Sequence, residues 1–181
     1  IDAERHLDYW TDGYNGERIA YSPGGQAHLT TWGSLRHSSN TALLAFIYSD
    51  NVTTTKANTY HDFAVRQINY ALGDNPINRS FMVGFGNNPA NSVHHRGAHG
   101  PWANSLQNNP VDSSHILYGA LAGGPSAAND QFDDDRGDFI ANEVATDYNA
   151  AFTGALARMY NEYGGNPLTN FPIVETPSRE E

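Results

Sequence analysis

Apolar residues recur at helical spacing in four parts of the chain, and this pattern predicts four helices. The near-continuous apolar residues of the second predict a helix that is buried on most of its sides. The third is amphipathic and ends at Gly73, a residue suited to a C-terminal cap. The fourth carries an apolar face and ends at Gly164. The predicted helices cover residues 2–10, 39–48, 56–72 and 143–163.

Long segments rich in Gly, Asn and Pro separate these helices. Residues 73–111 show little periodicity apart from a short strand-like stretch at 80–83, and residues 115–121 could form a short helix. No strand alternation and no parallel-sheet pattern is visible. Loops of this length in a compact domain usually carry function. The sequence therefore predicts an all-α scaffold with the chemistry on its loops.

The chain divides into a helical domain, residues 1–165, and an extended linker or tail, residues 166–181. The second part contains three prolines and no period, which is typical of an extended segment. Residues 1–5 of the chain resemble the middle of a helix, so we expect the chain to begin inside a larger protein.

Composition narrows the classes of partner. The net charge is −10, only 17% of residues are charged and 39% are apolar. A nucleic-acid binder needs a basic patch, and an anionic membrane surface needs the same, so we expect neither partner. The chain has no Cys, which excludes disulfides and thiolate metal sites. Many Asn, Ser, Thr and Tyr residues suit a surface that binds neutral polar matter.

The first candidate cluster is His94, His95 and Arg96, at the end of a loop rich in Gly and Asn, with Trp32 elsewhere in the chain. His and Arg side chains donate to hydroxyls or carboxylates, and indoles stack on the apolar faces of sugar rings. Two other interpretations remain. His94 or His95 could bind a metal with His99, although further ligands at a zinc spacing are lacking, or the histidines could cap backbone groups.

The second cluster is the acidic run 133–138, followed by Glu143. Such a run binds a cation, raises the pKa of one member or stays solvated. It does not fit a calcium-binding loop, because Gly137 falls where a ligand belongs. Asp134 and Glu143 would face opposite ways on one helix, so a shared site needs Asp134 on the loop and Glu143 at the helix start. There the helix terminus would lower the pKa of Glu143 and Asp147 would raise it.

Two gapped motifs now point to a family. Residues 80–88 leading to 93–96 resemble the histidine signature of glycoside hydrolase family 9, the endoglucanase-type cellulases. Phe132, Asp134, Phe139, Glu143 and Asn149 resemble its carboxylate signature. The stretches 13–16, 32–36 and 117–121 are also similar to the family, although His37 stands where many relatives have Tyr. The resemblance covers residues 1–165.

The resemblance implies an (α/α)6 barrel, of which this chain supplies the C-terminal part, and a secreted enzyme. The implied reaction is hydrolysis of internal β-1,4-glucosidic bonds in cellulose or related β-glucans, with inversion. Glu143 is similar to the general acid, Asp134 to a residue that orients the site, and Trp32 to an aromatic that stacks on glucose. The implied catalytic residues are His94, Asp134 and Glu143. The implied substrate-binding residues are Trp32, His95, Arg96 and Tyr148.

An inverting enzyme needs a second carboxylate about 6.5–9.5 Å from the acid. The family takes this base from an Asp-Ala-Gly-Asp-like motif, which these residues lack. We therefore expect the base to lie in an N-terminal part of the domain that would be this chain's partner. The resemblance implies no cofactor within this chain, and the family's calcium site would lie upstream. The alternatives are a half-barrel that binds oligosaccharide without cleaving it, one chain of a nicked enzyme, or a calcium-stabilised adhesion module around residues 133–138.

Overall fold

The computed structural model describes residues 2–100 and 110–166 and is mainly helical. An antiparallel hairpin of two short strands, pairing Ala20 with His28, lies between the first two helices along the chain. The predicted linker 166–181 lies, apart from Asn166, outside the described residues. The elements are α1 (Asp2–Trp10), β1 (Ala20–Tyr21), β2 (Ala27–His28), α2 (Ser34–Asn51), α3 (Ala57–Leu72), α4 (Arg96–His99) and α5 (Thr146–Tyr163).

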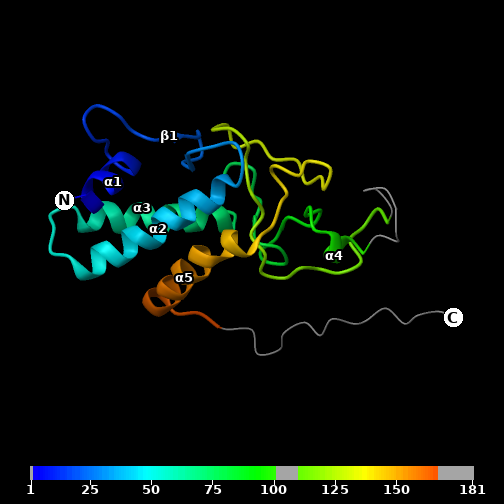
Figure 1. The fold of residues 1–181 in the computed structure, drawn as a ribbon. Coiled ribbons are helices and arrows are strands. Elements are labelled where there is room, and N and C mark those ends of the chain that lie inside the picture. Colours follow the sequence, from blue (N-terminus) through cyan, green and yellow to red (C-terminus); the bar gives the residue numbers. More distant parts are fainter. Residues whose placement is uncertain (1, 101–109, 167–181) are drawn as a thin grey trace.

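Helix α2 packs against both α3 and α5, and these three helices hold the main core. Figure 1 shows them gathered at one end of the molecule, while the long loops extend from the other. Phe46 of α2, Phe63 of α3 and Phe152 of α5 are fully buried between them. Burying each of these rings contributes about 1.5–3 kcal/mol. The helical scaffold predicted from periodicity is therefore present, with the hairpin as an unpredicted addition.

Helix α2 differs from the prediction in length and in burial. It begins at Ser34 because Gly33 takes a left-handed conformation (φ 62°) that precedes the first helical turn. The prediction that this helix is buried on most sides is wrong. Leu44 and Ile47 are 51% and 52% exposed, since α3 and α5 cover only part of its surface.

Helix α5 begins at Thr146, so the prediction that Glu143 opens this helix is wrong. Ala145 before it is extended. Glu143 and Val144 instead form isolated β-bridges with His94 and Ala122. The backbone N–H and C=O groups of this segment therefore pair with other loop segments instead of forming a helical turn.

Two further local predictions are wrong. Residues 115–121 form no helix: Ala120 closes a turn onto the carbonyl of Leu117, and Leu121 forms an isolated bridge with Met82. The strand-like stretch 80–83 forms only single bridges, one of them between Ser80 and Pro89. A second small apolar cluster explains why these loops hold a fixed shape. Its buried members are Val83, Val93, Ala98, Ala120 and Val144.

Candidate active site

Glu143 is held on both sides by backbone pairing. It bridges His94 in a parallel arrangement, and its carbonyl accepts a hydrogen bond from the amide of Gly123 at 2.9 Å. The amide of His94 donates to the carbonyl of Asn142 at 2.8 Å. Three loop segments that are distant in sequence therefore meet at the backbone of Glu143, and two of the predicted site residues, Glu143 and His94, lie side by side.

Two donors reach the same oxygen of the Glu143 carboxyl group. The indole Nε1 of Trp32 lies 2.5 Å from Oε2, and the hydroxyl of Tyr148 lies 2.6 Å from it. An indole N–H can only donate, so Oε2 acts as an acceptor. No side chain or amide of residues 2–100 and 110–166 donates a hydrogen bond to Oε1. A proton carried by this carboxyl group would therefore sit on Oε1.

Tyr148 is a donor at neutral pH. Its side chain is almost fully buried in α5. Burial, and secondly the hydrogen bond to Glu143, raise the pKa of the Tyr148 phenol well above its ordinary value. The phenol therefore keeps its proton and directs it to Oε2. The predicted neighbour of Glu143, Asp147, is engaged elsewhere, because Arg36 pairs with it at 2.7 Å and lowers the pKa of Asp147.

The backbone engages one ring nitrogen of His94. Its Nδ1 lies 2.7 Å from the carbonyl oxygen of Arg136. Since a carbonyl only accepts, Nδ1 carries the hydrogen, and Nε2 of the neutral ring is left as an acceptor. Phe139 packs between the rings of His94 and Trp32, with ring centres 5.9 Å and 5.6 Å away. Phe139 thus connects two of the predicted site residues, His94 and Trp32.

Asp134 lies on the loop, as predicted, and its carboxylate binds the backbone of the segment that leads to His94. Its Oδ1 accepts from the amides of Ser92 at 2.8 Å and Asn91 at 3.1 Å. Its Oδ2 accepts from Asn91 and from the guanidinium of Arg79 at 3.2 Å. Both oxygens are occupied by donors, and none of these contacts involves Glu143. The arrangement is that of a carboxylate that fixes a loop.

His95 and Arg96 lie at the start of α4, and both are exposed. The Nδ1 of His95 accepts from the amide of Ala98 at 3.1 Å and caps this short helix, so one part of the capping alternative holds for His95. His95 also lines a cavity of about 340 Å³ that includes Val144 and Thr146, close neighbours of Glu143 in the chain. His95 therefore borders the neighbourhood of Glu143, and neither His95 nor Arg96 forms a hydrogen bond with its carboxylate among the described residues.

The acidic run is used for local backbone contacts. Asp135 accepts from the amide of Gly137, and Asp138 from the amides of Ile140 and Ala141. Within the described part of the chain, no group of three or more His, Asp or Glu residues is arranged to hold a metal ion. Nor does any helix in this part have the length and apolar character to cross a membrane.

Two supporting arginines were not predicted from the sequence. Arg36 lies over the ring of Tyr148, and Arg79 binds Asp134. Arg36 could have been suspected, because it belongs to the same motif as Trp32. Arg79 gave no such signal, because its partner is 55 residues away in the chain.

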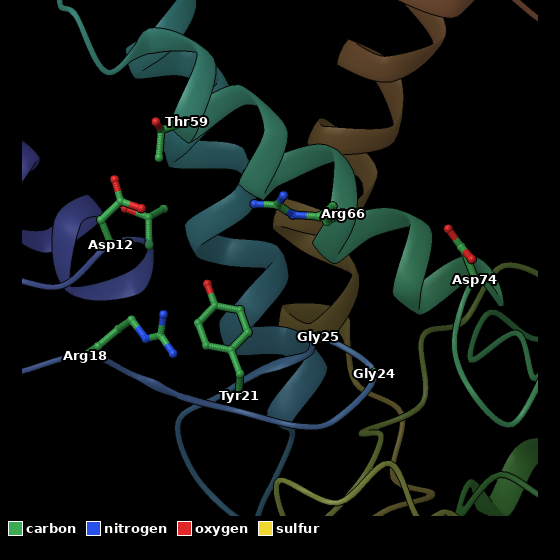
Figure 2. A pocket seen from close by; sticks show the side chains of 9 residues that line it. Asp12, Arg18, Tyr21, Gly24, Gly25, Thr59, Arg66 and Asp74 are labelled. Atoms are coloured by element: carbon green, nitrogen blue, oxygen red, sulfur yellow. The ribbon is translucent and has the colours of Figure 1, made fainter.

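A larger cavity, of about 520 Å³, lies between α1, the hairpin and α3, as Figure 2 shows. Arg18, Arg66, Asp12 and Asp74 line it, so its formal charges balance. None of the predicted site residues lines it. The cavity is therefore separate from the residues that contact Glu143.

Comparison with known proteins shows the family to which the chain belongs. The model of glycosyl hydrolase family 9 matches residues 1–156. Endoglucanase B of Cellulomonas fimi is 58% identical over 181 residues, which cover 99% of this chain and 17% of that protein. Endoglucanase A of Bacillus pumilus is 57% identical over 179 residues, 95% of this chain and 27% of that protein. The chain thus spans well under a third of the length of these relatives.

Solved structures of cellulases are also similar to this chain. Endoglucanase CelQ from Clostridium thermocellum, complexed with cellotetraose, matches 96% of this chain and 29% of its own, with a TM-score of 0.91 and 52% sequence identity. The cellulase Cel9M in complex with cellobiose matches 81% of this chain and 33% of its own, with a TM-score of 0.72 and 37% identity. The mainly helical chain therefore matches parts of larger helical-barrel cellulases.

Proposed function

The chain belongs to glycosyl hydrolase family 9, and we propose that it supplies the general acid, Glu143, of an endo-β-1,4-glucanase. The observation that carries this proposal is the state of the Glu143 carboxyl group. Its backbone is fixed by His94 and Gly123, one oxygen holds two donors, and the other is open to a ligand. A rigid carboxyl group with one open oxygen is what proton transfer to a glycosidic oxygen requires.

In the proposed step, the proton passes from Oε1 of Glu143 to the glycosidic oxygen while the bond from that oxygen to the anomeric carbon breaks. The electron pair of this bond stays on the leaving oxygen. The negative charge left on Glu143 is stabilised by the donors on Oε2, the indole of Trp32 and the phenol of Tyr148. These donors are already in place before the charge develops, which is the favourable arrangement for electrostatic catalysis.

Water must attack the anomeric carbon from the opposite face and give its proton to a base. Asp134 is a poor choice for this base, because donors already occupy both of its oxygens. We propose that the base lies in an N-terminal part of the domain and that this chain is the C-terminal part of an (α/α)6 barrel. The exposed apolar face of α2, with Leu44 and Ile47 beside α1, supports such a partner.

The proposed ligand is a neutral β-1,4-glucan. The Nε2 of His94, the exposed Arg96 and the exposed ring of Trp32 suit sugar hydroxyls and the faces of pyranose rings. His95 borders the adjoining cavity. The cellotetraose bound by the CelQ structure, to which this chain is similar, supports this class of ligand. We further propose that the enzyme is secreted and that this chain holds no cofactor.

The test compares two proteins. One is this chain of 181 residues. The other is a complete domain, in which this chain replaces the matching segment of the Cellulomonas fimi endoglucanase B. Intact mass and the release of reducing sugar from carboxymethyl-cellulose are measured on the same samples. We expect release by the complete domain and none by the chain alone. Release by the chain alone would place the base within it. A folded complete domain that binds cellotetraose without cleaving it would contradict the proposal.

A further inference from the structure

Arg36 is clamped against the ring of Tyr148 by three contacts. Its guanidinium carbon lies 4.9 Å from the centre of that ring. Its Nη1 donates to Oδ2 of Asp147 at 2.7 Å, and its Nη2 contacts Nε2 of His37 at 3.2 Å. Arg36 belongs to the first turn of α2 and Tyr148 to the first turn of α5. The clamp therefore fixes the start of one helix to the start of the other.

The hydroxyl end of Tyr148 is confined as well. The Cα of Gly33 packs so closely that an added Cβ would stand 2.8 Å from the Tyr148 hydroxyl oxygen. With Arg36 over its face and Gly33 against its hydroxyl, the ring has little freedom to turn. Its O–H is thereby held on Oε2 of Glu143, at 2.6 Å.

The arrangement carries a cost that a purely structural arginine would avoid. The Nε of Arg36 is buried and finds no hydrogen-bond partner among the described residues. A buried donor without a partner is unfavourable, yet the flat guanidinium remains stacked on Tyr148. A cation at this place strengthens the phenol as a donor, and it opposes the effect of burial on the pKa of Tyr148. Such local costs concentrate at functional sites.

We propose that Arg36 is a positioning residue for the general acid and acts on Glu143 through Tyr148. The proposal rests on the proposed function of Glu143. Among the described residues, no hydrogen bond or ion pair joins Arg36 to Glu143, since the ionic partner of Arg36 is Asp147. Loss of the clamp should therefore impair proton donation to the leaving group and leave sugar binding nearly unchanged.

The test uses the complete domain defined above and two substrates that differ in leaving group. In cellotetraose the leaving group is a sugar alkoxide, which departs poorly and needs a proton from the acid. In a 2,4-dinitrophenyl β-cellobioside the leaving group is a stable phenolate, which departs without that proton. We expect Arg36→Lys to lower kcat on cellotetraose about tenfold, with KM within about twofold, and to change kcat on the dinitrophenyl substrate less than about twofold. In Asp147→Asn the ionic anchor is removed while Arg36 stays, so a smaller loss of the same kind is expected.

A double-mutant cycle asks whether the effect passes through Tyr148. The Arg36→Lys and Tyr148→Phe double variant is expected to lose no more kcat on cellotetraose than Tyr148→Phe alone. Additive losses, or an equal loss on both substrates, would overturn the proposal. Glu143→Gln serves as the reference: if it too loses kcat equally on both substrates, the proposed acid is wrong. If only the Arg36 variants lack the leaving-group dependence, the positioning role alone fails.

Arg158 provides a matched control. It also lies over an aromatic ring, that of Phe46 at 5.4 Å, and pairs with Asp50, but it contacts none of the site residues. Arg158→Lys is expected to change the melting temperature without altering kcat on either substrate. If Arg158→Lys reproduced the pattern of Arg36→Lys, a general loss of helix packing would explain both, and the proposal would be overturned.

Discussion

The Cα of Gly33 lies directly against the phenol of Tyr148, where an added Cβ would stand 2.8 Å from the hydroxyl oxygen and 2.9 Å from Cζ. Gly33 also has φ of +62°, a backbone conformation that residues other than glycine rarely adopt. The same residue thus begins α2 and forms a wall of the proposed acid site. Backbone geometry and catalytic geometry are coupled at this position.

Gly33→Ala should therefore damage both stability and activity. The matched control is Gly16→Ala, because Gly16 also has positive φ (+82°) but has open space where a Cβ would be. We expect Gly16→Ala to lose about 1 kcal/mol from backbone strain alone. Gly33→Ala should lose more and also lower kcat, since Tyr148 must move off Glu143. Urea unfolding and kcat of the complete domain check this; equal effects of the two substitutions would refute it.

Trp32 has two separable contributions. Its indole donates to Oε2 of Glu143, and 42% of the residue remains exposed, where the proposed sugar ring would stack. Trp32→Phe removes the donor and keeps an aromatic face, so kcat should fall about tenfold, the value of one hydrogen bond to a charged group, with KM little changed. Trp32→Ala should in addition raise KM. A wild-type kcat for Trp32→Phe would show that the hydrogen bond contributes nothing to turnover.

Asp134→Asn should loosen the loop before His94. An amide keeps one acceptor oxygen but cannot serve Arg79, Asn91 and Ser92 together, so we expect a loss of about 1–3 kcal/mol and lower activity. Hydrogen exchange should speed up at the amides of Asn91 and Ser92. Asp135→Asn is the control, because the hydrogen bond that Asp135 accepts from the amide of Gly137 survives in Asn. Unchanged exchange in Asp134→Asn would contradict the role of Asp134 in holding the loop.

His61 makes stability depend on pH. Its Nε2 lies 2.9 Å from Oε2 of Glu162, and this hydrogen bond raises the pKa of His61 above its ordinary 6.5. The pair therefore stabilises the fold fully below pH about 6.5, and this contribution disappears as pH rises through the folded-state pKa. Burial lowers the pKa of His6, His28 and His37, which contributes with the opposite sign.

A difference measurement isolates the His61 contribution. The melting temperature of the wild type should exceed that of Glu162→Gln by more at pH 5.5 than at pH 8.5. A constant difference will remain, because Glu162 also pairs with Arg158, whose charge does not change in this range. If the difference between the two proteins were the same at both pH values, the His61 pair would not be the source of the pH dependence.

Periodicity predicted α3 and the body of α5 because their partners recur every turn along one segment. It placed the start of α5 wrongly because Glu143 pairs with His94, 49 residues earlier, and such pairing leaves no periodic signal. The helix predicted for residues 115–121 is absent for the same reason. The side chain of Asn149 binds the amide of Leu121 and the carbonyl of Gly119, which replaces helical hydrogen bonds.

The gapped motifs pointed to Glu143 and His94, and the family resemblance added Tyr148; the structure places both His94 and Tyr148 in contact with Glu143. They did not reveal what holds these residues in place. Arg36 reaches Tyr148 only because α2 packs against α5, and Arg79 reaches Asp134 only because two long loops meet. Contacts of this kind are set by tertiary packing, so spacing along one sequence does not contain them.

The most direct test of the central claim is the kcat of Glu143→Gln in the complete domain on carboxymethyl-cellulose. Gln is of similar size and keeps an acceptor for Trp32 and Tyr148, so the fold and the melting temperature should be unchanged. Because Gln has no transferable proton, we predict that kcat falls by at least about 100-fold. A kcat within a few-fold of the wild type, in a variant that melts normally, would show that Glu143 is not the general acid.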